Sequence, residues 1–259
     1  MVPAAESAVP RPIRLRRWWL VPLFVWAAVL VASFQLQGAQ IRKQAVEVAL
    51  EGARNMFHMV LLTRAWNASH GGVYVPVTPQ TQPNPYLEHE RRDVVTTDGV
   101  EMTMINPAYM TRLIASMAES EQGAVFRLTS LRPIRPANAP DDWERVALTA
   151  FERGEKEVVG VVGEGVARAL RFMAPLPVTE PCLACHAKQG YKVGEVRGGI
   201  SVSQAYAPIE RAVQAAVQRA ALVHGLIFIV VAALGWLLLE MLRRRWLELV
   251  GTVGALESA

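Results

Sequence analysis

LVHGLIFIVVAALGWLLL, residues 222–239, and WWLVPLFVWAAVLVASF, residues 18–34, are the two long apolar stretches that decide how this chain is organised. Each approaches the length of about 20 residues that crosses about 30 Å of hydrocarbon. The first stretch has the basic flank of a secretory signal peptide. Its apolar core, however, is longer than the usual length of about 7–15 residues, and no A-x-A-like cleavage site follows it. These features favour an uncleaved anchor, so the sequence predicts two transmembrane helices.

Charge gathers at the two ends of the chain. Four arginines lie within residues 1–17, and Arg243, Arg244 and Arg245 follow the second stretch. Because positively charged flanks stay on the cytoplasmic side, we expect both tails in the cytoplasm and residues 35–221 across the membrane. Residues 35–221 carry 20 basic and 19 acidic side chains, so they lack the clustered basic face of a nucleic-acid-binding surface.

The expected domains follow from these spans. They are a cytoplasmic tail (1–17), a first transmembrane helix (18–36), a periplasmic domain (37–221), a second transmembrane helix (222–241) and a cytoplasmic stub (242–259).

Between the spans the sequence predicts an α+β domain. Residues 39–66 read as one long helix, because apolar residues recur at three- and four-residue spacing without a proline. Residues 107–120 and 141–154 are two further predicted helices, and the second opens with Asp and Glu at capping-box spacing. Strand patterns fall at 71–77, 99–105, 124–131, 158–162, 168–176 and 198–206. We expect one small antiparallel sheet, held between residues 39–66 and a helix that begins at Pro208 and enters the second span.

The cysteines mark the site that carries chemistry. The chain has two of them, in Cys182-Leu183-Ala184-Cys185-His186. C-x-x-C-H is the attachment signal for c-type haem. Cys182 and Cys185 would add to the two vinyl groups of one porphyrin, and His186 would bind the iron as its proximal ligand. The expected location agrees, because c-type haem is assembled on the outer face of the bacterial cytoplasmic membrane.

Three other interpretations compete for the same residues. A structural disulfide between the cysteines suits an oxidising compartment but gives the histidine no role. A thioredoxin-like redox pair belongs near a βαβ pattern, and here the motif follows a strand and APLPVTEP. A zinc site needs a fourth ligand, usually from a second Cys/His pair, which the sequence lacks.

The chain also resembles a known family over about residues 40–206. The resemblance is carried by WNASHGGVYVPV, PNPYL, TTDG, MINPAYMTR, LTSLRPIRPANAPDDWE, MAPLPVTEPCLACHAKQGY and RGGISVS, which follow one another in this order. The family is that of haem-c-binding, PAS-like sensor domains. They stand outside the membrane in bacteria, ahead of histidine kinases, diguanylate cyclases or chemoreceptors, and some members are soluble cytochromes. The resemblance implies a PAS-like sheet with one covalent haem, and Cys182, Cys185 and His186 match the family's haem motif.

The sixth iron ligand stays open. At least one member of the family is thought to use a cysteine, but both cysteines of this chain belong to the haem motif. His70 is the first candidate, because the two glycines that follow it would let backbone approach a flat cofactor. His58 is the second, on the long helix beside Met56 and Met59, and a methionine or water remains as the alternative. The other methionines of the domain are more typical of core packing, and His89, among charged residues, is expected at the surface.

The leading functional hypothesis is a sensor in the bacterial inner membrane, with a periplasmic haem that detects redox state or a diatomic gas such as NO, CO or O2. It predicts a homodimer that signals to a cytoplasmic output domain or partner. An apolar stripe at Ile209, Val213, Ala216 and Ala220 suits a neighbouring helix, although it equally suits packing on the chain's own sheet. The alternative is a membrane-tethered monohaem electron carrier. A peroxidase-like enzyme is not expected, because no distal acid–base set is identifiable.

Overall fold

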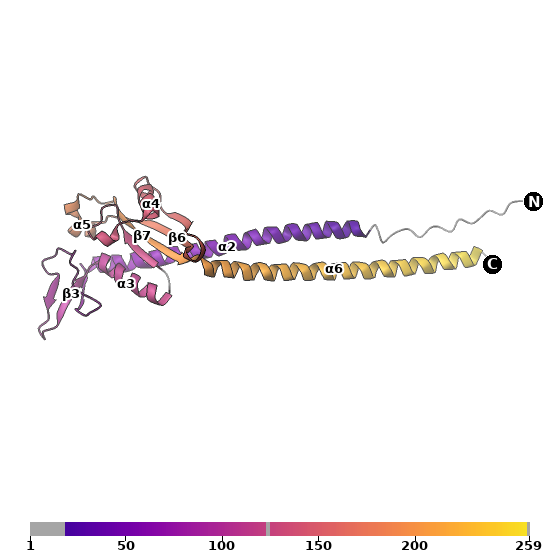
Figure 1. Cartoon of the computed structure of the whole chain (residues 1–259), viewed down its shortest axis with the longest axis horizontal. Coiled ribbons are helices and arrows are strands. Elements are labelled where there is room, and N and C mark those ends of the chain that lie inside the picture. The colour runs from indigo at the N-terminus through magenta and orange to yellow at the C-terminus, as the bar shows by residue number, and fades with distance from the viewer. Residues whose placement is uncertain (1–18, 123–124, 258–259) are drawn as a thin grey trace, which may run out of the picture. The chain divides into compact units, whose positions relative to one another are not determined.

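The computed structural model describes residues 19–122 and 125–257. The elements in chain order are α2 (Leu20–Ser69), β1 (Val73–Pro76), β2 (Asp93–Val95), β3 (Glu101–Ile105), α3 (Pro107–Gln122), β4 (Val125–Thr129), α4 (Asp142–Glu152), β5 (Val158–Val162), β6 (Ala169–Pro177), α5 (Glu180–His186), β7 (Val196–Ala205) and α6 (Tyr206–Glu257). Three short 3₁₀ helices lie at Pro136–Asn138, Gly165–Ala167 and Ala187–Gln189. The chain divides into two compact units, a domain of Ala45–Arg211 and a unit made of the two end segments (Figure 1).

The end unit contains the apolar parts of α2 and α6. Both helices are long and apolar enough to cross a membrane, with mean hydropathies of 1.8 and 2.5 in their most apolar windows. Within this unit they contact each other where His224 Nε2 lies 3.2 Å from Ser33 Oγ and the His224 ring meets Phe34 edge to face. α6 continues through Gly225 without interruption. The expected tail at 1–17 lies outside the described residues, as does Trp18 at the start of the expected first span.

The larger sheet of the domain is antiparallel, with strand order β4-β7-β6-β5. Its centre is the pairing of β6 with β7, in which Phe172 lies opposite Val202 and Met173 opposite Ser201. Successive side chains of a strand point to opposite faces of the sheet, so these neighbours enter different cores. A register shift between Leu176 and Pro177 ends this regular pairing just before the C-x-x-C-H motif.

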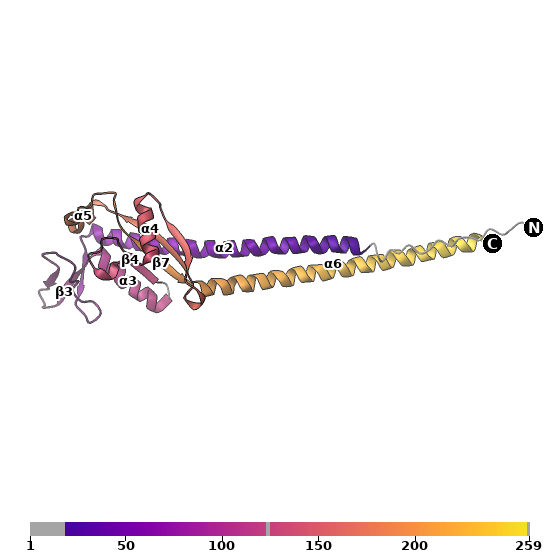
Figure 2. The same cartoon turned by 45° about the horizontal axis from the view of Figure 1, so that its top comes forward.

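A helix packs against each face of this sheet (Figures 1 and 2). On one face, Phe57 and Val60 of α2 pack with Phe172 of β6 and Val202 of β7. On the other face, the core consists of Ala147, Leu148 and Phe151 of α4 with Met173 of β6. The adjacent residues Phe172 and Met173 thus point to opposite faces of the sheet, and each belongs to the core on its own face.

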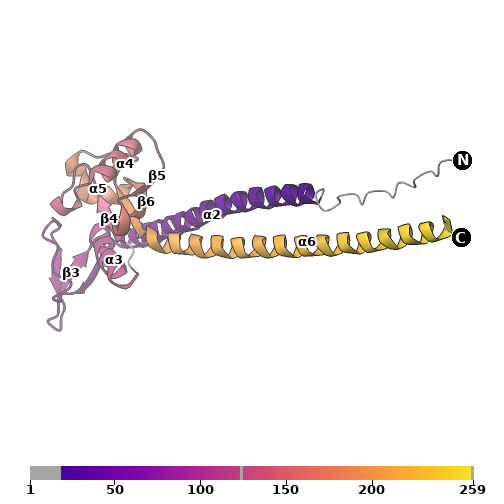
Figure 3. The same ribbon diagram turned by 45° about the vertical axis from the view of Figure 1, so that its right-hand side comes forward.

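The second sheet has the order β1-β3-β2 and is followed by α3. The expectation of one sheet is therefore wrong, and Figure 3 shows β3 standing apart from β4, β5 and β6. Alternation in the sequence identifies strands but not their partners, because pairing joins residues that are distant along the chain. β2, with the sequence DVV, was missed because three residues are too few for a periodic signal.

The predicted helices and strands are otherwise present, although the helix expected from Pro208 begins at Tyr206. The second face of the sheet packs against α4, where the helix from Pro208 was expected. α3 begins at the expected proline, with Asn106 Oδ1 accepting a hydrogen bond from Tyr109 N. At α4 the capping box is formed, with Asp141 as N-cap and Glu144 returning a bond to the Asp141 backbone. Glu144 is fully buried, and its Oε1 accepts hydrogen bonds from Arg171 and Ser201. The capping box is therefore also part of an ion network beneath the sheet.

Candidate functional site

The C-x-x-C-H motif forms α5, a helix of seven residues that starts three residues after β6. Thr179 precedes it in an extended conformation and accepts the Cys182 backbone N–H at 2.9 Å, which starts the first turn. Residues four apart on a helix lie on one face, so Cys182 and His186 share a side of α5. Cys182 is a free, half-buried thiol, 3.2 Å from Thr179 Oγ1. Cys185 belongs to α5, but its side chain lies outside the described part of the structure.

His186 contacts two polar side chains. Its Nδ1 lies 2.8 Å from Gln189 Oε1 and 3.2 Å from Arg197 Nε. Burial lowers the pKa of His186 below its ordinary value of 6.5, the bond to Gln189 opposes this, and the charges of Arg197 and Arg64 lower the pKa further. This shift favours the neutral ring, which is the form that binds a metal. Nε2 has no hydrogen-bond partner among the described residues.

Positive charge surrounds this histidine. Arg64, half-buried in α2, donates two hydrogen bonds from Nη1, to Pro107 O at 3.0 Å and Thr111 Oγ1 at 2.8 Å. Burial lowers the pKa of Arg64 to about 10, and the electrostatic interaction with Cys182 acts in the opposite direction. Arg64 thus interacts electrostatically with both Cys182 and His186.

Two more guanidiniums lie against the ring of Tyr191, which itself meets the His186 ring edge to face. Arg132 lies 4.2 Å and Arg197 5.0 Å from the centroid of Tyr191. Within residues 19–122 and 125–257, Arg64, Arg132 and Arg197 form no ion pair with a carboxylate. Arg64 and Arg197 are half-buried, whereas Arg132 is exposed. Cations without a paired carboxylate attract an anion, so this side of the domain suits a negatively charged group.

The two candidates for a sixth ligand do not contact the motif in the described structure. His70 follows the last turn of α2 and is exposed, with Nδ1 2.7 Å from Trp66 O and its ring 4.6 Å from the Trp66 ring. His58 is also exposed, and its ring meets that of the buried Phe57 edge to face. His89 is exposed, as expected, and its Nδ1 accepts the Arg91 N–H.

The glycines after His70 have a local structural role. Gly71 and Gly72 adopt φ values of +70° and +103°, which side-chain-bearing residues rarely adopt. A Cβ at Gly72 would also lie 3.0 Å from Met104 Cγ. The tight turn from α2 into β1 therefore explains both glycines without a cofactor.

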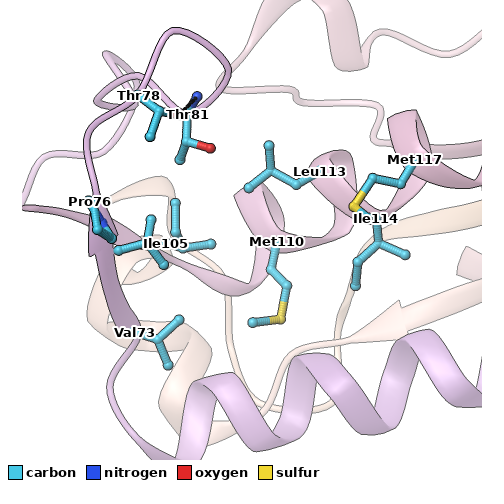
Figure 4. A pocket seen from close by; sticks show the side chains of 10 residues that line it. Val73, Pro76, Thr78, Thr81, Ile105, Met110, Leu113, Ile114 and Met117 are labelled. Carbon is cyan, nitrogen blue, oxygen red and sulfur yellow. Dashed lines mark hydrogen bonds between the residues drawn. The ribbon is translucent and has the colours of Figure 1, made fainter.

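An apolar pocket of about 390 Å³ lies elsewhere, between the smaller sheet and α3 (Figure 4). It is lined by Val73, Val75, Pro76, Thr78, Thr81, Ile105, Met110, Leu113, Ile114 and Met117. No residue of α5 lines it, so it is separate from the C-x-x-C-H motif. Met104 and Met173 are buried as expected of core residues, whereas Met117 is exposed at the edge of the pocket.

Sequence reasoning missed Gln189, Arg64 and Arg197. Gln189 had a local signal, because it lies three residues after His186 and directly before Gly190, whose φ of +80° ends the turn. Arg197 lies in β7, and Arg64 lies more than a hundred residues before the motif in α2. Nothing local marks either arginine, because only the tertiary structure brings them to His186.

The fold and the site together define an α+β domain that carries a single C-x-x-C-H helix beside its antiparallel sheet. The chain belongs to the Tll0287-like family, whose model matches residues 42–205. Among solved structures, the crystal structure of the cyanobacterial heme-protein Tll0287 is similar, with 17% sequence identity and a TM-score of 0.41. The similarity covers 61% of this chain and 94% of that chain. A search of curated proteins returned no match.

Proposed function

We propose that this protein is a membrane-anchored haem sensor of the bacterial inner membrane, with one c-type haem on Cys182 and Cys185 and His186 as the proximal ligand. The observation that carries the proposal is the placement of Cys182 and His186 on one face of α5, with Nδ1 of the histidine hydrogen-bonded and Nε2 free. Covalent haem supplies an iron that changes oxidation state and binds diatomic gases.

The described residues fit such a group. Attachment requires a free thiol, and ligation requires the neutral imidazole, which the lowered pKa of His186 favours. Arg64, Arg132 and Arg197, which have no carboxylate partner in the described structure, would balance the two propionate charges of a haem. The similar protein Tll0287 is a heme-protein, which agrees with this assignment.

The proposed orientation places the domain in the periplasm and both tails in the cytoplasm. It rests on the arginines that flank the two apolar helices. If a reporter enzyme is fused after Ala259, we expect activity from a reporter that works only in the cytoplasm and none from a reporter that works only in the periplasm. A reporter that is active in the periplasm from this position would contradict the orientation.

Signalling is supported by the direct connection between β7 and α6. β7 ends at Ala205 and α6 begins at Tyr206, so no linker separates the strand that carries Arg197 from the helix that enters the membrane. A displacement of Arg197 would act on a strand that continues as this helix. We propose that a homodimer passes the change to a cytoplasmic output domain or partner.

One observation favours the alternative, an electron carrier tethered to the membrane. Glu180 and Pro181 at the start of α5 are exposed, so the motif lies close to solvent, where a redox partner could approach. The carrier and the sensor share the haem but differ in whether the membrane helices respond to it. Cross-linking of α6 between subunits in the oxidised and reduced states would separate them.

The haem itself is tested on protein produced with a cytochrome c maturation system. We expect the haem to stay with the chain through denaturing electrophoresis, and to be lost in the Cys182→Ala, Cys185→Ala double variant. His186→Ala should lose the low-spin spectrum but keep the covalent haem, because the thioether bonds do not depend on the axial ligand. Haem that is extracted by acidic solvent from the wild-type protein would refute covalent attachment.

A further inference from the structure

One nitrogen atom of His186 has two partners that require opposite protonation states. Gln189 Oε1, 2.8 Å from Nδ1, can only accept a hydrogen bond, so it requires a proton on Nδ1. Arg197 Nε, 3.2 Å from the same atom, can only donate, so it requires a lone pair on Nδ1. A neutral imidazole carries one proton, and the two hydrogen bonds therefore belong to different tautomers.

The tautomer decides whether the ring can bind iron. When Nδ1 donates to Gln189, Nε2 keeps its lone pair and is free to act as a metal ligand. When Nδ1 accepts from Arg197, the proton lies on Nε2 and blocks ligation there. Gln189 and Arg197 therefore compete for Nδ1 of His186, and ligation of iron by Nε2 requires the hydrogen bond to Gln189.

The backbone holds Gln189 in place for this bond. Ala187–Gln189 form a 3₁₀ turn directly after α5, and Gly190 ends it with a left-handed conformation that other residues rarely adopt. This turn returns the Gln189 side chain toward the ring three residues earlier. The bond from Gln189 is also the shorter of the two.

Arg197 is held by contacts that do not involve the histidine. Its Nη1 donates to Ser130 Oγ at 2.6 Å, and Ser130 Oγ in turn donates to the Arg197 carbonyl. Its guanidinium lies over Tyr191, on which Arg132 also lies. Because no carboxylate pairs with Arg197 in the described structure, its charge is not neutralised locally and acts on whatever His186 binds.

We infer that Gln189 is a positioning residue that directs Nε2 of His186 to the iron, and that the Arg197 cation shifts the iron toward its reduced state. This inference rests on the proposed haem function. A hydrogen-bond acceptor on a ligating histidine makes the ring a stronger donor to the metal, and a nearby cation disfavours the extra positive charge of the oxidised iron.

The test measures spin state and midpoint potential of the full chain in detergent, with covalent haem. Gln189→Leu removes the acceptor and leaves Arg197 as the partner of Nδ1, so the low-spin fraction should fall. Adding Arg197→Met to this variant removes the competitor, so low-spin haem should return. Gln189→Glu should keep the low-spin spectrum and lower the midpoint potential, because a carboxylate is a stronger acceptor than an amide.

Arg197→Met alone should lower the reduction equilibrium constant about tenfold, which is about 59 mV for one electron. Arg197→Lys retains the charge and should retain the potential. Arg168→Gln is the matched control, because it removes an equal charge far from the haem motif. Arg168 directly precedes β6, about 30 Å along the strand from Pro177, at the end of β6 that leads to the motif.

The outcomes separate the two proposals. A Gln189→Leu protein that stays low-spin, or a double variant no better than the single one, would overturn the role of Gln189. An unchanged potential in Arg197→Met would overturn the role of Arg197. Either result leaves the covalent haem intact on the denaturing gel, whereas a wild-type chain without covalent haem would remove the proposed function and this inference with it.

Discussion

The ring of Phe57 in α2 meets the ring of Phe172 in β6 edge to face, with 5.7 Å between the ring centroids. Both side chains are buried in the core between the helix and the larger sheet. The long helix that leaves the first apolar stretch is thus fixed to the central strand of the domain, and this strand leads to the C-x-x-C-H helix.

Replacing Phe172 with Ala should destabilise the domain by about 3–5 kcal/mol, because it leaves a cavity and removes buried apolar area. Thermal unfolding followed by circular dichroism measures the effect. Val161→Ala on β5, at a side chain that is 42% exposed, is the control and should cost about 0.5 kcal/mol.

A double-mutant cycle of Phe172→Ala with Phe57→Ala should return about 0.5–1.5 kcal/mol of coupling between the rings. Additive effects would mean that the two rings do not act as a pair.

Acid should destabilise the domain through Asp141. Burial raises the pKa of Asp141, but the Glu144 backbone N–H and the Arg171 guanidinium outweigh it and hold the pKa below its usual value of 3.8. A carboxyl whose pKa is lower in the folded state contributes stability above its unfolded pKa, and this stability is lost as pH falls through the folded pKa. The melting temperature of the wild-type protein should therefore decrease when the pH is lowered below about 4.

Asp141→Asn is the matched variant for this pH dependence, because an amide oxygen still caps α4 but has no charge to titrate. Its melting temperature should be lower than that of the wild type at neutral pH, and the difference should shrink as the pH falls. A difference that stays constant from neutral pH to pH 3 would show that the Asp141 charge does not contribute.

The sixth ligand can be identified by spectroscopy. If His70 binds the iron, His70→Ala should convert a six-coordinate low-spin spectrum to a high-spin one, because a strong-field ligand is removed. His58→Ala is the paired variant, at a histidine of α2 that is also exposed. An unchanged His70→Ala spectrum together with a high-spin His58→Ala spectrum would reverse the assignment. No change in either would leave a methionine or water as the ligand.

Redox-dependent cross-linking separates the sensor from the electron carrier. Val213 and Ala216 of α6 are half-buried, and single cysteines there should join two subunits if the stripe lies at a dimer interface. In a sensor the cross-linking rate should differ between oxidised and reduced haem, since the two states must bias two arrangements of the helix. These variants need the haem cysteines already occupied, so only holo-protein is used.

Efficient cross-linking that ignores the redox state would favour a static tether and hence the carrier. An absence of cross-linking at both positions would argue against the homodimer.

Several features could be predicted from the sequence because they depend on neighbouring residues. The two apolar stretches are long enough to identify by composition alone. The capping box of α4 needs Asp141 and Glu144 three residues apart, and the C-x-x-C-H spacing is likewise local. The sequence also marked most strands correctly, because alternation is a property of the strand itself.

The pairing of strands and the surroundings of His186 were decided by the tertiary structure. Two sheets form where one was expected, because hydrogen-bond partners such as β6 and β7 are chosen by packing against α2 and α4 and not by local pattern. Arg197 contacts His186 from β7, and the charge of Arg64 in α2 acts on the same ring. The sequence by itself therefore determined which residues could hold a cofactor, and only the fold determined which charges and hydrogen bonds act on them, because such contacts join residues that no local spacing relates.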